Sequence, residues 1–132
     1  MTGMEARTFH GGPPGLRPGD AILPPSETGV RCSSDYGAAG THRRDRVYLT
    51  DSLAAATMFA ALHPSGRGQV YEVRPDGPLE PDPDCRAEGL SFQCPRATVV
   101  RMFKVRGKDR KRVRRALLAG RPIPETREME VA

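Results

Sequence analysis

The sequence predicts a small mixed domain that combines short strands with few helices and a large share of loop. The chain has 132 residues, enough for one hydrophobic core but not for two. It contains 14 glycines and 13 prolines, a content that favours turns and irregular segments. Hydrophobic residues make up 37% of the chain and fall in short runs. Because a membrane-spanning helix needs about 20 apolar residues, this pattern argues against a membrane protein.

The N-terminal part predicts two short strands around a turn. A β-favouring run at residues 8–10 is followed by the Gly/Pro-rich stretch 11–15, which ends it. Residues 16–20 (LRPGD) have the chemistry of a turn, and residues 21–23 can form a brief strand before two prolines. Residues 26–45 are polar and lack periodicity, which indicates a functional or flexible loop.

The clearest local pattern is a β–α–β succession in the middle of the chain. Residues 46–50 (RVYLT) and 69–74 (QVYEVR) are predicted strands. A helix is expected over residues 52–63, with Thr50 or Asp51 as its N-cap. Its apolar residues fall on one face, which we expect to be buried: Leu53, Ala56, Ala60 and Ala61.

The C-terminal part predicts a strand followed by a helix. Residues 79–89 are acidic and rich in proline, whereas 97–105 (ATVVRMFKV) is a good strand candidate. Residues 108–119 are predicted to be helical, ending before Gly120 and Pro122. The expected organisation is a single domain over 1–132, with a core over about 8–105, a basic helix over about 106–120 and a loose tail over 121–132.

The positive charge of the chain is local. Residues 101–115 contain nine Lys or Arg and one Asp, a balance of +8, so the rest of the chain sums to −3 against a total of +5. One interpretation is a solvated helix that docks through Val113, Ala116 and Leu117. The other is contact with nucleic acid, although three Tyr, four Phe and no Trp supply few stacking partners. The side chains that would make this contact are Arg110, Lys111, Arg112, Arg114 and Arg115.

The cysteine pattern indicates free thiols in a reducing cytoplasm. The three cysteines are Cys32, Cys85 and Cys94, and none forms a CxxC pair. A zinc site on the last two would need two more ligands, and no histidine stands at ligand spacing. The N-terminus also lacks the apolar core of a signal peptide.

Two polar residues of the predicted strands are candidates for chemistry. In the strand 46–50, alternation places Val47 and Leu49 on one face and Tyr48 on the other. His10 similarly points away from Phe9, and the glycines that follow it would let a ligand approach the backbone. The competing interpretation is an ordinary loop histidine and a packing tyrosine.

Several segments resemble the rifamycin ADP-ribosyltransferase family, known as Arr, in order and spacing over roughly residues 8–105. They are Phe9-His10-Gly11, residues 16–20, residues 47–50 with Leu53, Ala55 and Ala56, residues 66–73, and residues 77–83. The family pattern has a histidine before a glycine, a tyrosine in a Tyr-Ile/Leu-Thr strand and an aspartate before a proline. In this chain His10, Tyr48 and Asp82 occupy those positions.

The resemblance implies a small ADP-ribosyltransferase fold of α+β class, in which two packed β-sheets form an NAD cleft with few helices. It implies that NAD is the co-substrate, that no metal is used, and that ADP-ribose is transferred to a hydroxyl of a rifamycin. Departure of nicotinamide leaves an oxocarbenium-like ribose, which a nearby carboxylate stabilises.

The resemblance also implies a role for each site residue. His10 would bind the adenosine ribose, the Gly11 backbone would hold the nicotinamide amide, and Tyr48 would stack on the nicotinamide ring. Thr50, on the strand of Tyr48, is a further candidate for NAD binding. Asp82 would stabilise the cation or orient the acceptor hydroxyl.

Departures from the family pattern affect the acceptor side more than the NAD side. The segment between Asp82 and Ser91 is shorter than in the family, Phe92 stands where a tyrosine is usual, and the loop 26–45 differs. NAD use is therefore better supported than a rifamycin acceptor. Three alternatives stay open: Glu80 or Asp84 as the acid, nucleic acid or protein as the acceptor, and a non-catalytic nucleic-acid-binding accessory protein.

Overall fold

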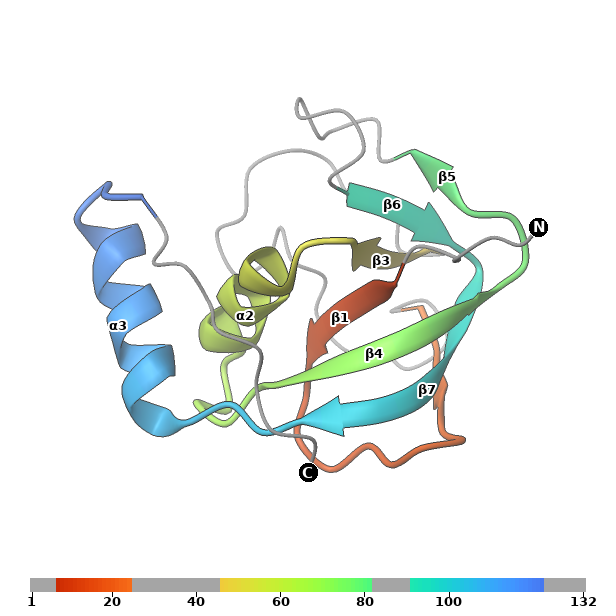
Figure 1. Ribbon diagram of the computed structural model, residues 1–132, viewed down its shortest axis with the longest axis horizontal. Coiled ribbons are helices and arrows are strands. Elements are labelled where there is room, and N and C mark those ends of the chain that lie inside the picture. Colours follow the sequence, from red (N-terminus) through yellow and green to blue (C-terminus); the bar gives the residue numbers. More distant parts are fainter. Residues whose placement is uncertain (1–6, 25–45, 82–90, 123–132) are drawn as a thin grey trace.

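The computed structural model describes residues 7–24, 46–81 and 91–122, which form one antiparallel sheet and two helices (Figure 1). The strands are β1 (Thr8–Gly12), β2 (Ala21–Ile22), β3 (Val47–Thr50), β4 (Gln69–Asp76), β5 (Glu80–Pro81), β6 (Ser91–Cys94) and β7 (Arg96–Phe103). The helices are α2 (Leu53–Leu62) and α3 (Gly107–Leu118). The α+β class is confirmed, and the predicted elements all occur, most within two residues of their expected bounds.

The seven strands belong to one hydrogen-bonded sheet, in the order β2-β7-β4-β1-β3-β6-β5, and not to two separate packed sheets as expected. The join between the two halves is narrow. Strand β1 is in register with β4 over five residues but meets β3 at a single pair, Phe9 with Thr50. The predicted β–α–β succession is present, with β1 lying between its two strands.

Helix α2 packs directly on the backbone of the sheet (Figure 1). A Cβ on Gly11 would lie 2.2 Å from the Ala56 carbonyl oxygen, and one on Gly68 would lie 2.1 Å from the Ala60 carbonyl oxygen. The predicted face is confirmed, since Ala56, Ala60 and Ala61 are buried. The N-cap is Ser52, whose Oγ accepts from the Ala55 N–H at 3.1 Å, and not Thr50 or Asp51 as predicted.

The core has two parts, one on each face of the sheet. One joins β1, α2, β4 and β7 through Phe9, Ala56, Ala60, Val70, Phe103 and Val105. The other comprises Ile22, Val47, Leu49, Tyr71, Val73, Cys94, Ala97 and Val99. In this second part the Tyr71 hydroxyl donates to the Pro13 carbonyl and accepts from the Leu16 N–H, which fixes the segment after β1. The predicted turn follows, closed by the Asp20 N–H on the Arg17 carbonyl at 2.9 Å.

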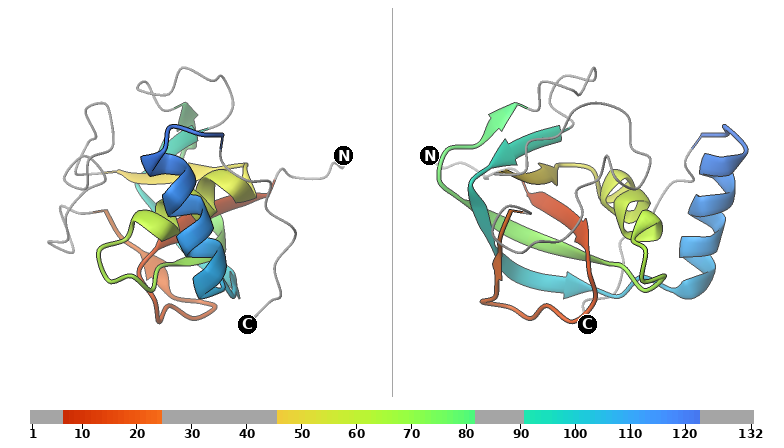
Figure 2. Two further views of the ribbon diagram at one scale, coloured as in Figure 1. Left: turned by 90° about the vertical axis from the view of Figure 1, so that its left-hand side faces the viewer. Right: turned by 180° about the vertical axis from the view of Figure 1, so that it is seen from behind.

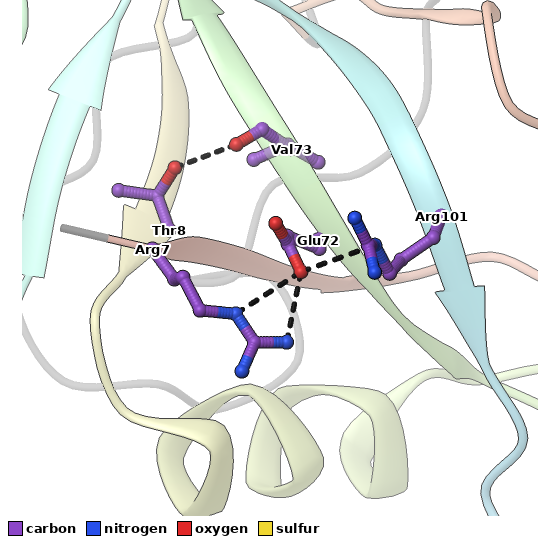
Figure 3. A network of polar contacts seen from close by, with 5 residues as sticks. All are labelled: Arg7, Thr8, Glu72, Val73 and Arg101. Carbon is purple, nitrogen blue, oxygen red and sulfur yellow. Dashed lines mark hydrogen bonds and ion pairs between the residues drawn. The ribbon is translucent and has the colours of Figure 1, made fainter. Parts of the chain in front are cut away.

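A cluster of charges ties the start of the described chain to two strands (Figure 3). Glu72 on β4 accepts from Arg7 at 2.8 and 3.1 Å, and Arg101 Nε on β7 lies 3.3 Å from the same oxygen. The Arg7 guanidinium also lies 5.2 Å from the centre of the Phe9 ring. Both arginine side chains are about half exposed (47%), so solvent weakens these pairs and we assign them a modest share of the stability.

Helix α3 docks on α2 at one end of the molecule (Figure 2). Val113 and Ala116 are buried and Leu117 is partly buried, so the docking interpretation of this helix is confirmed. Two of its arginines reach main-chain carbonyls near the end of α2: Arg114 donates to Ala61 O at 2.7 Å and Arg110 to Gly68 O at 3.0 Å. Neither described helix has the length and apolar character needed to cross a bilayer.

Candidate active site

The imidazole of His10 lies in the seam where β1 and β3 separate. Beyond the single pair of Phe9 and Thr50, the two strands have no further register partners. At this point His10 Nδ1 lies 2.9 Å from the main-chain oxygen of Tyr48, so a side chain bridges strands that the backbone no longer pairs. The structure therefore brings the predicted residues His10 and Tyr48 together, through the carbonyl of Tyr48 and not through its phenol.

The hydrogen bond defines which nitrogen of His10 carries the proton. A carbonyl oxygen only accepts, so Nδ1 is the donor and, in the neutral ring, Nε2 keeps a free lone pair. Burial lowers the pKa of His10 from its ordinary value of 6.5, the bond to Tyr48 opposes this shift, and the charge of nearby His63 adds to it. The ring is thus neutral near pH 7, with Nε2 available as an acceptor.

The two glycines after His10 serve packing more directly than ligand approach. A Cβ on Gly12 would lie 2.8 Å from His10 Nε2, so only glycine leaves the ring in this position. The side-chain direction of Gly11 is filled by α2, where a Cβ would meet two main-chain atoms of the helix. The packing of α2 alone thus requires glycine at position 11, and the backbone groups of Gly11 stay candidates for binding.

Tyr48 stands on the predicted face of its strand, in a row that crosses three strands. Val47 and Leu49 are buried in the core, and Tyr48 is half-buried on the other side, as alternation predicts. Its register partner on β6 is Gln93, and the register partner of Gln93 on β5 is Glu80. Because antiparallel partners share a face, Tyr48, Gln93 and Glu80 lie side by side.

Two further candidates have structural partners. The Glu80 carboxylate lies 3.3 Å from Arg46 Nε, so this alternative acid is engaged in an ion pair. The buried Thr50 hydroxyl accepts from the Ser52 N–H at 3.0 Å and so helps to begin α2. This bond gives the Thr50 hydroxyl a structural role that does not depend on a ligand. Asp82 and Asp84 lie outside the described residues, as do Cys32, Cys85 and the loop 26–45.

The cysteine that the structure describes, Cys94, is unsuited to act as a nucleophile. Cys94 is fully buried in the core, and its Sγ lies 3.3 Å from the Arg96 carbonyl oxygen. Burial raises the pKa of this thiol to about 11, which keeps it protonated near neutral pH.

Sequence reasoning missed Gln93, which is 5% exposed and whose Oε1 finds no hydrogen-bond partner within the described parts of the chain. Alternation within residues 91–94 separates Gln93 from Phe92, but only the register with β3 places it beside Tyr48. No local signal in the sequence supplies that register.

Comparison with known proteins gives one match. The family model described as rifampin ADP-ribosyl transferase (Arr-ms) matches residues 8–101, which run from β1 into β7 and leave out α3. No curated protein matches the chain.

Proposed function

The chain belongs to the rifampin ADP-ribosyl transferase family, and on that premise we propose that it cleaves NAD and transfers the ADP-ribose to a hydroxyl of a rifamycin. The observation that carries the proposal is the seam between β1 and β3, where His10 and Tyr48 meet. The seam lies within the part of the chain that matches the family.

The state of His10 suits the role proposed for it. With Nδ1–H committed to the Tyr48 carbonyl, Nε2 accepts a hydroxyl hydrogen, as binding of the adenosine ribose requires. The low pKa of His10 keeps this acceptor free of a proton near pH 7. A protonated ring would offer a second donor in its place, so we expect NAD binding to weaken in acid.

The other roles follow the chemistry of the transfer. Tyr48 stacks on the nicotinamide ring and the Gly11 backbone holds its amide. The bond between nicotinamide and ribose C1′ breaks with its electron pair leaving on nicotinamide. The acceptor oxygen then bonds to C1′ and loses its proton. Asp82, one residue beyond β5, stabilises the positive ribose or receives that proton.

Nucleic acid is not favoured as the acceptor. Of the five basic residues considered for such contact, Arg110 and Arg114 bond to main-chain carbonyls beside α2, and Arg112 pairs with Asp109 at 3.1 Å. Within α3 this leaves Lys111 and Arg115 of that group, too few for a site that depends on many phosphate contacts.

The test is incubation of the purified protein with NAD and rifampicin, followed by mass spectrometry. We expect ADP-ribosyl-rifampicin together with free nicotinamide. Tyr48→Ala and Asp82→Ala should abolish transfer while thermal unfolding shows that the fold survives. Glu80→Gln is the matched carboxylate control and should retain transfer. Full activity of Asp82→Ala would exclude the role of that aspartate, and nicotinamide release without adduct would direct the search to another acceptor.

A further inference from the structure

Gln93 carries a buried acceptor that the folded chain leaves unused. Its side chain is 5% exposed, and Oε1 has no hydrogen-bond partner among the residues that the structure describes. A buried carbonyl oxygen without a donor is unfavourable, because it has lost its hydrogen bonds to water and accepts none from the protein. The chain contains one other glutamine, Gln69, whose Oε1 accepts from the Val105 N–H at 3.0 Å. The unpaired oxygen is therefore particular to position 93.

The position of Gln93 indicates what kind of donor it would meet. It is the register partner of Tyr48 on one side and of Glu80 on the other. Side chains that are register partners have Cβ atoms about 5 Å apart, so a flat ring lying on Tyr48 has its edge within reach of Gln93. The other register partner of Gln93, Glu80, is paired with Arg46 at 3.3 Å, so the unpaired oxygen of Gln93 is the group left to contact the ring.

We infer that Gln93 Oε1 accepts a hydrogen bond from the carboxamide N–H of the nicotinamide moiety that stacks on Tyr48. The inference rests on the proposed function and adds a residue that selects for the amide form of the dinucleotide. A carboxamide offers the N–H that pairs the buried oxygen. A carboxylate in its place offers none, and it also sets negative charge against the partial negative charge of the Gln93 oxygen. Gln93 is thus a specificity-determining residue of the NAD site.

The experiment compares NAD with nicotinic acid adenine dinucleotide, which differs in having a carboxylate for the carboxamide. Nicotinamide or nicotinic acid release is measured to give kcat/KM for each. The wild-type chain should prefer NAD by about 10- to 100-fold, the range expected when a buried polar group is left unpaired. Gln93→Leu should lower kcat/KM for NAD and reduce this preference to a few-fold. Its unfolding temperature should stay level or rise, because an unpaired oxygen is removed.

Gln69→Leu is the matched control, since it makes the same change at the glutamine whose oxygen has a partner. It should lower the unfolding temperature, because the Val105 N–H loses its acceptor, and it should leave the preference for NAD intact. Gln93→Met tests the same point with an unbranched side chain of similar length, should the leucine variant fail to fold.

The outcomes separate this inference from the proposed function. If the wild-type chain neither binds nor cleaves NAD, both fail. If it cleaves NAD but Gln93→Leu and Gln93→Met keep the full preference for the carboxamide, the inference alone is overturned. A third substrate, nicotinamide hypoxanthine dinucleotide, lacks the adenine amine. If the Gln93 variants relax discrimination against this compound instead, Gln93 binds the adenine end and the assignment to the carboxamide is wrong.

Discussion

Substitution of Gly11 by alanine should destabilise the fold strongly, because α2 occupies the space of the missing side chain. The added Cβ would lie 2.2 Å from the Ala56 carbonyl oxygen and 2.7 Å from the Ala60 nitrogen. Both are main-chain atoms of one helix, so no side-chain rotation relieves the contact. The helix has to shift away from the sheet, or β1 has to shift out of register with β4.

The magnitude follows from this geometry. Overpacking in a core costs about 1–3 kcal/mol, and a rigid main-chain contact belongs at the upper end of that range. For a domain of this size 3 kcal/mol corresponds to a fall of about 10 °C in Tm. Gly68→Ala should behave alike, since its Cβ would lie 2.1 Å from the Ala60 carbonyl oxygen. Gly107→Ala is the control, because a Cβ at that helical position meets nothing within 4 Å.

The assay is thermal unfolding followed by circular dichroism, together with NAD turnover at a temperature where every variant is folded. Gly107→Ala should leave Tm unchanged or raise it slightly, as alanine favours helix over glycine. The reasoning is refuted if Gly11→Ala unfolds within about 1 °C of the wild type. If that same variant also lost NAD turnover, Gly11 would be needed for ligand approach, as the sequence first suggested, and not for packing.

Three further predictions concern the protonation and capping of named groups. Because the pKa of His10 is lowered in the fold, His10 binds a proton more readily in the unfolded chain than in the folded one. The contribution of the neutral ring to the free energy of unfolding is therefore complete above about pH 6.5 and is lost as pH falls through the pKa of the folded state. Urea unfolding from about pH 7.5 to 5.5 should show this loss, and His10→Asn should reduce but not abolish it, since burial lowers the pKa of His63 as well. Arg114→Ala should lower the free energy of unfolding by about 1 kcal/mol, because the Ala61 carbonyl near the end of α2 loses its donor. Lys111→Ala, on the exposed side of α3, is the control and should change Tm little. Burial raises the pKa of Cys94 to about 11, so this thiol should resist iodoacetamide in the folded protein at about pH 8 and react once the chain unfolds. Peptide mapping measures the labelling of Cys94, and rapid labelling in the native protein would contradict its burial.

The parts of the fold that sequence reasoning anticipated are those governed by neighbouring residues. Pro18 and Gly19 specify the turn that the Asp20 N–H closes, with Gly19 at φ +93°. The spacing of Ala56 and Ala60 specified the face of α2 that meets the sheet. Alternation placed Tyr48 opposite the buried side chains of its strand. Each of these inferences needs no knowledge of which strand pairs with which.

The parts that were missed depend on contacts between distant segments. The packing role of Gly11 exists only because a helix more than forty residues later lies on it. Gln93 becomes noteworthy only through its register with Tyr48. No local pattern carries these facts, so composition and periodicity could not supply them.

The narrow join in the sheet connects the fold to the proposed chemistry. A regular ladder between β1 and β3 would continue past Phe9 and pair the backbone of both strands, and it would close the space in which His10 now lies. Instead the imidazole takes the Tyr48 carbonyl as its partner, and Gly12 leaves room for the ring. Beside this join, α2 packs on the backbone of Gly11 and Gly68. The hydrogen bond that joins the two halves of the sheet at this point thus also fixes the tautomer of His10, with Nε2 free to accept.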